Sequence, residues 1–328
     1  MRIPFPQLKA EFKRILLQHN FTEEKAEACA RIFAGNSLDG VYTHGLNRFP
    51  VFVQYVQEGL IDSNAMPTLI DQMGAIERWD GNLGPGVLNA EFGMARAITL
   101  AKANGIGCVA LRNTNHWMRG GTYGWQAAEA GCISISFTNT IANLPPWGGI
   151  DPRLGNNPLV VAIPRKGGHV VLDMAITQYS FGKLYQYKAA GEQLPLPGGY
   201  DADGNLTTDP AAIIESQRPL PVGFWKGSGL ALVLDLLATV LSKGDSTEKI
   251  TERKKETGVS QVFICIRPDN DAQTTQLIEQ ILDYTKTSRL EPGKQIQYPG
   301  EGTLKTRLQN LQEGVPVDEK IWQQVLAM

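Results

Sequence analysis

Two short polar runs in this 328-residue chain carry side chains that could act together in proton transfer and anion binding. The first run, residues 43–48, contains His44 and Arg48 at the expected start of a helix. A histidine titrates near neutrality and can give a proton to the alkoxide that forms when a carbonyl accepts hydride. An arginine presents a planar fork that matches a carboxylate. Together they suit a 2-oxo acid, but a surface histidine beside a solvated arginine explains these residues equally well.

The position of residues 43–48 at the expected N-terminus of a helix also favours anion binding. His44 and Arg48 would lie at a helix N-terminus, where the helix dipole disfavours positive charge. Such a pair is stabilised when an anion lies between it and the helix amides. The run therefore predicts an anion site formed partly by backbone N–H groups.

The second polar run covers residues 112–121 and is centred on His116. It follows an expected strand, and Gly120-Gly121 leads into an expected helix. Ligands of open α/β sheets gather at this end of the strands. We therefore favour a binding site here; the alternative is a capping loop with a structural histidine.

Three segments resemble known ligand-binding loops but lack residues that those loops need to bind their ligands. The glycines of Gly81–Gly86 stand in the order G-x-x-G-x-G, and Pro85 removes an amide that a pyrophosphate would use, so we predict a structural turn. Asp201–Asn205 resembles the start of a calcium loop, but its glycine is at loop position four rather than six, and position twelve is Ala212 rather than glutamate. Lys226-Gly227-Ser228 has lysine before glycine, whereas a P-loop has glycine before lysine, as G-K-[ST]. No metal or nucleoside triphosphate site is expected.

The composition limits the partners and the compartment. The formal net charge is −2, so we expect no binding to nucleic acid or to acidic membranes. The four cysteines stand singly beside apolar residues, which is typical of reduced, buried thiols. The N-terminus lacks the apolar core of a signal peptide, and the longest apolar run, Leu230–Leu234, is too short to cross a bilayer. We expect a cytoplasmic protein.

The pattern of apolar residues predicts an α/β fold with helices at both ends of the chain. Strands are expected at about 75–80, 107–113, 132–139, 159–164, 169–175 and 261–267. Helices are expected at about 6–19, 23–37, 47–58, 87–103, 122–130, 178–190, 225–244, 271–289, from about 301, and from 319 to the end. Residues 192–222 are predicted to form a long surface excursion, and the helix after residue 225 is predicted to be buried.

Several motifs occur in an order that strongly resembles one enzyme family. They are Thr43-His44-Gly45 with Arg48, Asn115-His116-Trp117, Pro146-Trp147-Gly148, Gly155-Asn156-Asn157-Pro158, Asp173-Met174 and Trp225-Lys226-Gly227-Ser228-Gly229. This order resembles the second malate/L-lactate dehydrogenase family, which is unrelated to the Rossmann lactate dehydrogenases. The resemblance covers essentially the whole chain.

The resemblance implies a non-Rossmann, mixed-sheet NAD(P)-binding fold and a homodimer. It implies a helical N-terminal region at 1–74, an α/β core at 75–298 and C-terminal helices at 299–328 that pack on the N-terminal region. His44 matches the proton donor of the family, while Arg48 and His116 match residues that bind substrate. The residues that match its cofactor-binding segments are His169, Val170, Val171, Leu172, Asp173, Met174 and Ala175, then Trp225 and Lys226, and finally Gly300, Glu301 and Gly302.

The implied activity is hydride transfer from NAD(P)H to a small sugar-derived 2-oxo acid. The resemblance alone makes NADH the expected coenzyme. NADPH stays the alternative, because residues 175–179 and 299–302, which lie in cofactor segments, depart from the pattern of similar members. Alternative substrates are malate, lactate, ureidoglycolate or a cyclic imino acid. A non-enzymatic alternative is a sugar-acid binding protein, although that role would predict the loss of His44 or Arg48, and both are present.

Overall fold

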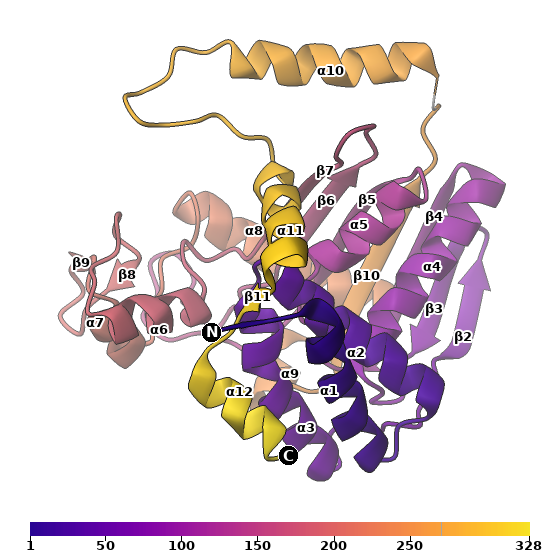
Figure 1. Ribbon diagram of the computed structural model, residues 1–328, viewed down its shortest axis with the longest axis horizontal. Coiled ribbons are helices and arrows are strands. Elements are labelled where there is room, and N and C mark those ends of the chain that lie inside the picture. The colour runs from indigo at the N-terminus through magenta and orange to yellow at the C-terminus, as the bar shows by residue number, and fades with distance from the viewer. Residues whose placement is uncertain (270) are drawn as a thin grey trace.

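The computed structural model describes residues 1–269 and 271–328 and is built around one seven-stranded sheet (Figure 1). Its strands, in spatial order, are β2 (Thr68–Met73), β3 (Ile76–Asp80), β4 (Ile106–Thr114), β10 (Val259–Ile266), β5 (Ile133–Thr138), β6 (Leu159–Ile163) and β7 (Val170–Met174). Within this sheet only β3 and β4 run parallel; the other neighbours are antiparallel. A Rossmann fold requires a largely parallel sheet, so the expected non-Rossmann fold class is confirmed.

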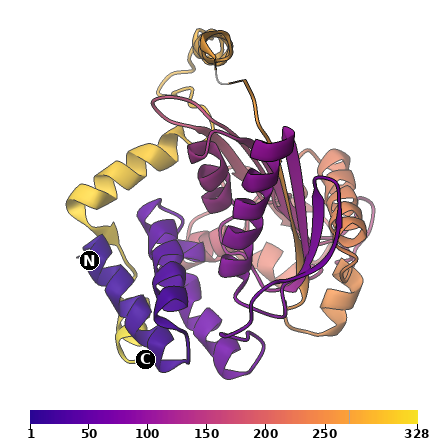
Figure 2. The ribbon, with the colours of Figure 1, turned by 90° about the vertical axis from the view of Figure 1, so that its right-hand side faces the viewer.

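Helices cover both faces of the sheet (Figure 2). One face carries α4 (Gly86–Asn104) and α5 (Gly121–Glu129), and the other carries α8 (Trp225–Ser242). Successive residues of β10 point to opposite faces, as strand geometry requires. Phe263 packs into the apolar cluster of α4 and α5, whereas Val262 packs into that of α8. The central strand thus holds two separate apolar cores together.

A layer of helices from both ends of the chain lies beside this core (Figures 1 and 2). It comprises α1 (Phe5–Gln18), α2 (Glu23–Leu38), α3 (Phe49–Gln57), α11 (Glu301–Glu313) and α12 (Glu319–Leu326). The two ends are also joined by a short antiparallel ladder between β1 (Arg2–Ile3) and β11 (Val315–Pro316). As the sequence predicts, Thr22 caps α2 and Asp318 caps α12 through their side-chain oxygens.

The region between β7 and α8 is more regular than the sequence analysis predicts. Its elements are α6 (Phe181–Ala190), β8 (Gly199–Tyr200), β9 (Leu206–Thr207) and α7 (Pro210–Ser216). They enclose a small apolar core of Leu184, Leu194 and Ile213, which is too sparse to produce a clear periodic pattern. The sequence analysis also missed the edge strand β2, which is almost wholly exposed, the short helix α9 (Thr247–Glu252) and the two-residue strands β1 and β11.

The prediction that α8 is buried is wrong. Only 33% of α8 is buried, and its outer face exposes Leu232, Val233, Leu236, Leu237 and Val240. It is apolar on nearly every side because one face packs on the sheet while the other has no cover among the described residues. By length and composition α8 is the single described helix that could span a membrane. However, Asp235 of α8 accepts a hydrogen bond from Asn139 in the core (2.9 Å). This contact is typical of a helix that packs on a folded domain.

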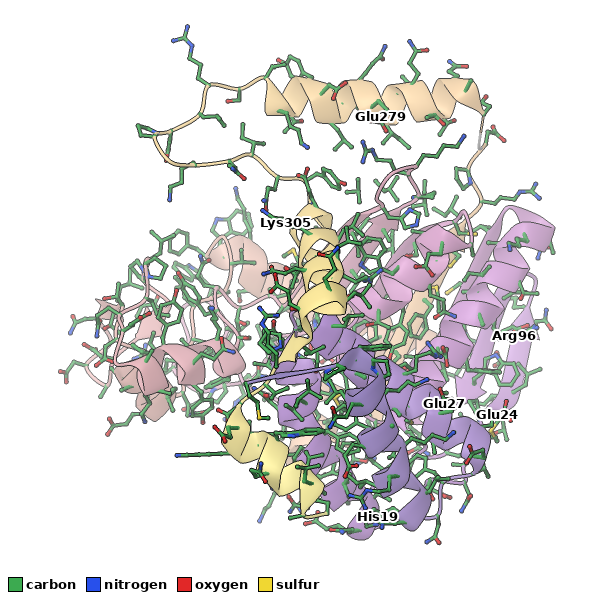
Figure 3. All side chains as sticks on the ribbon, in the orientation of Figure 1. His19, Glu24, Glu27, Arg96, Glu279 and Lys305 are labelled. Carbon is green, nitrogen blue, oxygen red and sulfur yellow. The ribbon has the colours of Figure 1, made fainter. Side chains whose placement is uncertain are left out.

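The helix α10 (Ala272–Lys286) stands away from the rest of the molecule (Figures 1 and 3). None of its residues is buried. Glu279 connects it to the β6–β7 turn by accepting two hydrogen bonds of 2.7 Å from Arg165. All four cysteines of the chain are buried and unpaired.

Candidate active site

His44 is the last residue of a short 3₁₀ helix, Tyr42–His44, and Gly45 joins this helix to a second one, Leu46–Arg48; His44 is therefore not at the start of a regular α-helix. The end of α2 holds this turn in place: Asn36 donates to the His44 carbonyl (2.9 Å), and Ser37 Oγ accepts from the Leu46 amide (2.9 Å). A side chain at position 45 would overlap Ser37, so only glycine allows this approach. The ring of His44 is thereby fixed, with Nδ1 3.2 Å from the Thr43 hydroxyl.

The expected anion site on helix amides is not present here. The amides of Arg48 and Phe49 both donate to the Gly45 carbonyl (3.1 and 3.2 Å), because the 3₁₀ turn runs directly into α3. We therefore expect an anion at this turn to be bound mainly by side chains. The Arg48 side chain suits this role, since it forms no hydrogen bond or ion pair with any residue that the structure describes.

His116 faces His44 from the loop after β4. The two rings stack with centroids 5.7 Å apart and planes inclined by 21°. His116 Nδ1 accepts a hydrogen bond from the Met118 amide (2.9 Å), so the neutral ring carries its proton on Nε2. Met118 adopts a left-handed backbone conformation with φ of 63° to make this contact. The loop thus fixes one tautomer of His116, whose ring stacks on that of His44 and keeps a proton on Nε2.

The electrostatics of the two rings are unusual. Burial is the largest cause that lowers the pKa of His44 to about 3, and the charges of His116, Arg48 and Arg119 add to it. Burial, followed by the charge of Arg48, likewise lowers the pKa of His116 to about 3. Both rings are therefore neutral at physiological pH in the free protein. Strongly shifted titratable groups gathered around an arginine with a free ligand-binding fork are typical of a catalytic site.

A buried charge cluster behind His44 was not found from the sequence. Asp39 at the end of α2 binds Arg119, and it also accepts two hydrogen bonds from Arg307 of α11 (2.6 and 2.7 Å). Arg119 Nε lies 4.0 Å from Asp173 of β7. Burial raises the pKa of Asp173, although Arg119 and the Gly121 amide oppose this. These contacts join residues far apart in the sequence, so no local pattern could reveal them.

Two of the three expected cofactor segments lie side by side. The amide of Val171 donates to the Pro299 carbonyl (2.9 Å), which brings residues 169–175 against Gly300–Gly302. A side chain at Gly300, whose φ is 98°, would crowd the His169 carbonyl. Glu301 is held at the start of α11 by Lys286 (2.8 Å). The remaining members of the first segment are the β7 residues Val170, Leu172, Asp173 and Met174, followed by Ala175.

The third expected segment, Trp225-Lys226, lies beyond the other end of β7. The Val222 amide donates to the Ile176 carbonyl (2.9 Å), which places the start of α8 close to residue 176. Fewer free amides are present there than the sequence suggests, because Lys226 N already donates to the Gly223 carbonyl (3.2 Å). Gly227 allows close packing, because a side chain there would overlap the Val222 carbonyl. Gly229 does not have this role, since the space around it is open.

The rejected glycine loop is part of the scaffold of the site. The Asn115 side chain donates to the carbonyls of Leu83 (2.9 Å) and Gly84 (3.1 Å), and Gly86 packs directly on the backbone of Asn115 and His116. Gly84, Pro85 and Gly86 are all buried. The turn therefore supports the His116 loop.

Comparisons with known proteins agree with this geometry. A family model described as malate/L-lactate dehydrogenase matches residues 3–326. The chain belongs to this family. It is 46% identical over 327 residues to a protein of Haemophilus influenzae named 2,3-diketo-L-gulonate reductase, with 98% of both chains covered. It is also 46% identical to a protein of the same name from Escherichia coli, with both chains fully covered. The chain is an oxidoreductase.

Solved structures of the family have the same fold. Malate dehydrogenase from Entamoeba histolytica matches with a TM-score of 0.94 and 25% identity, covering 100% of this chain and 96% of the other. Sulfolactate dehydrogenase from Methanocaldococcus jannaschii matches with a TM-score of 0.89 and 29% identity, covering 99% and 95%. The fold thus serves several 2-hydroxy acid chemistries, and the substrate depends on the side chains of each member.

Proposed function

We propose that this oxidoreductase reduces the 2-oxo group of a small sugar-derived acid with NAD(P)H, and that 2,3-diketo-L-gulonate is the first substrate to test. The observation that carries the proposal is Arg48, which has no partner among the described residues, beside the stacked, neutral rings of His44 and His116. The substrate is taken from the names of the relatives that are 46% identical over the whole chain.

Arg48 is the residue that binds the substrate carboxylate in this proposal. Two other arginines near His116 are already paired. Arg112 donates to Asp80 (3.0 Å), and Arg119 binds Asp39. A bidentate pair with Arg48 would fix the C2 carbonyl relative to the histidines, and such orientation accounts for a large part of enzymatic rate enhancement.

His44 gives the proton to the developing C2 alkoxide. In the free protein the positive charge of Arg48 is one of the causes that keep this ring neutral. A bound carboxylate offsets that charge and so favours protonation of His44 only when substrate is present. The Thr43 hydroxyl near Nδ1 orients the ring, and His116 presents its Nε2–H group beside it.

The expected cofactor residues fit an elongated anionic ligand. The run from His169 to Ile176 can span roughly 20 Å when extended, with Gly300–Gly302 at one end and Trp225-Lys226 at the other. Lys226, at the start of an 18-residue helix, supplies a cation and the positive end of the helix dipole for a phosphate group. A nicotinamide coenzyme, when bound, supplies the hydride.

We also propose a cytoplasmic homodimer in which a second copy covers the outer face of α8. Its five exposed large aliphatic side chains form a continuous apolar stripe, which is unusual on a monomeric protein. Asp235, on the same helix, is bound to the core, which favours a protein partner over lipid.

The proposed activity is tested by following NADH and NADPH consumption with a panel of acids. The panel contains 2,3-diketo-L-gulonate, oxaloacetate, pyruvate and a cyclic imino acid, the last because delta1-piperideine-2-carboxylate reductase from Pseudomonas syringae shares the fold with a TM-score of 0.86 and 25% identity. We expect the highest kcat/KM with the diketo acid and NADH. Consumption of neither coenzyme with any acid would favour a binding protein instead.

A further inference from the structure

Glu256 is a carboxylate of the site that the sequence analysis did not single out. It lies in the loop between α9 and β10, within the charged run Arg253-Lys254-Lys255-Glu256, which resembles an ordinary solvated surface. In the structure its side chain is only 13% exposed. Glu256 Oε1 lies 3.6 Å from Nε2 of His116, and Arg48 is the cation that faces it.

The surrounding loop holds Glu256 in this direction. Arg253 donates to the Thr257 carbonyl (2.9 Å) across Gly258, whose φ is 73°. On the other side, Thr251 Oγ1 accepts from the Ala142 amide (2.9 Å). The Ile141 amide donates to Glu256 Oε2 (3.3 Å). The carboxyl group is thus fixed through one oxygen, while the other oxygen faces His116.

The open oxygen of Glu256 and the Nε2–H group of His116 form an acceptor and a donor side by side. Their separation of 3.6 Å is longer than a good hydrogen bond, so both groups can still bind a third one. A hydroxyl group complements this pair, because it donates to the carboxylate and accepts from the ring. A second carboxylate would be repelled by Glu256, and a methyl group would leave both polar groups without a partner.

We propose that Glu256 is a specificity-determining residue, which together with His116 binds a hydroxyl of the substrate chain and selects polyhydroxylated 2-oxo acids. The inference rests on the proposed reductase function and deepens it. Burial raises the pKa of the Glu256 carboxyl, and the Arg48 charge opposes this.

A merely structural role of Glu256 makes a different prediction. If the residue only orients His116 or balances the charge of Arg48, its replacement should affect all 2-oxo acids alike. If it binds a hydroxyl, only substrates that carry the hydroxyl should suffer. The ratio of two substrates within one variant separates the two roles and cancels any general loss of activity.

The experiment compares Glu256→Gln with the wild type on 2,3-diketo-L-gulonate, oxaloacetate and 2-oxobutyrate. Glu252→Gln is the matched control, because Glu252 is exposed on α9 and, within residues 1–269 and 271–328, forms an ion pair with Lys249 alone. We expect kcat/KM for the polyhydroxylated acid to fall about 3- to 10-fold, mainly through KM, because the neutral amide oxygen accepts a weaker hydrogen bond than a carboxylate. The value for 2-oxobutyrate should stay within about twofold, and that for oxaloacetate should rise, because the repulsion is removed.

An equal fall for all three acids, or no change for the polyhydroxylated one, would overturn the inference. If the glutamine variant does not fold, Glu256→Asp replaces it, because aspartate retains the charge but withdraws the oxygen by one methylene. The ratio of kcat/KM for the polyhydroxylated acid to that for 2-oxobutyrate should then fall as well. Failure of the proposed function is distinguishable, because the wild type itself would then show no preference for the polyhydroxylated acid over the other two.

Discussion

At the scale of single residues, the site combines two rings that are neutral when empty with an arginine that has no partner among the described residues. His44 has a pKa of about 3 in the free protein, yet it must carry a proton when the carbonyl is reduced. Substrate binding to Arg48 is therefore coupled to the protonation of His44. This coupling would keep the acid inactive until a carboxylate is in place.

The replacement His44→Ala should lower kcat by roughly 10²- to 10⁴-fold, the usual contribution of a positioned general acid. Coenzyme binding should change little, because His44 lies outside the expected cofactor segments. Steady-state kinetics and a fluorescence titration with NADH measure the two effects. Turnover at the wild-type rate would exclude His44 from the mechanism.

The replacement Arg48→Lys should be severe although it conserves the charge. Lysine loses the planar fork, and misplacing a reacting group by about 1 Å can lower the rate on the order of 100-fold. We expect kcat/KM for the 2-oxo acid to fall steeply in both Arg48→Lys and Arg48→Ala, with unchanged affinity for NADH. A lysine variant close to the wild type, with both enzymes losing rate similarly as salt rises, would instead indicate simple charge steering.

The two histidines should also make the fold sensitive to acid. Their folded-state pKa values of about 3 lie below the ordinary value of 6.5, so the unfolded chain binds more protons as the pH falls through 6.5. Stability is therefore fully present above this pH and is lost below it. Between about pH 7.5 and about pH 5.5 each histidine should cost about 1.4 kcal/mol of the free energy of unfolding.

Urea unfolding at both pH values tests this prediction. The matched protein is the double variant His44→Gln/His116→Gln, which removes both groups but leaves Asp173 and Glu256. Burial raises the pKa of these two carboxyl groups, so they act in the opposite direction, and the comparison isolates the histidines. Parallel pH dependence in the two proteins would show that the rings are not held neutral.

At the scale of elements, the start of α4 supports the catalytic loop. Gly86 is buried against the carbonyls of Asn115 and His116, and an added Cβ would overlap both. The helix can approach the loop this closely only because position 86 has no side chain. The position of His116 thus depends on a helix that contributes no polar side chain to the site.

We expect Gly86→Ala to destabilise the protein by about 1–3 kcal/mol through overpacking and to lower kcat/KM by displacing His116. Gly35→Ala in α2 is the matched control, since a Cβ there meets nothing within 4 Å. That variant should be more stable by about 0.5–1 kcal/mol, because alanine favours the helix, with unchanged activity. Thermal unfolding and initial rates measure both. Full stability and activity of Gly86→Ala would contradict the close approach.

At the scale of the whole molecule, α8 links the central sheet, the exposed aliphatic stripe and an expected cofactor segment. Its inner face packs on the central sheet and its outer face exposes an aliphatic stripe, while its first residues belong to an expected cofactor segment. A partner seated on α8 would therefore lie close to the cofactor region. Assembly and coenzyme binding are expected to be linked.

The replacement Leu236→Glu, at a site that is 55% exposed, should convert the proposed dimer into a monomer with weaker NADH binding. Burying an unpaired charge in an apolar interface costs several kcal/mol, enough to dissociate a typical dimer at micromolar concentration. The control Leu17→Glu, in α1 and 41% exposed, should remain dimeric. Sedimentation velocity gives the answer; a wild-type monomer would refute the proposed dimer itself.

The sequence by itself determined the features that depend on local pattern. The fold class and the helix caps at Thr22 and Asp318 follow from apolar period and capping chemistry. The order of glycines around Pro85 was sufficient to predict a structural turn, because a dinucleotide loop needs specific amides. His44, Arg48 and His116 were candidates because their chemistry is readable from residue type alone.

Only the tertiary structure decided which of these groups meet and which others join them. Glu256 and Asp39 stand in stretches that resemble solvated surface, and they reach the site through contacts with residues at least 80 positions away in the sequence. The outer face of α8 could not be distinguished from its inner face, since both are apolar and only packing against the sheet separates them. The pKa values of the histidines depend on burial and on neighbouring charges, which no local pattern encodes.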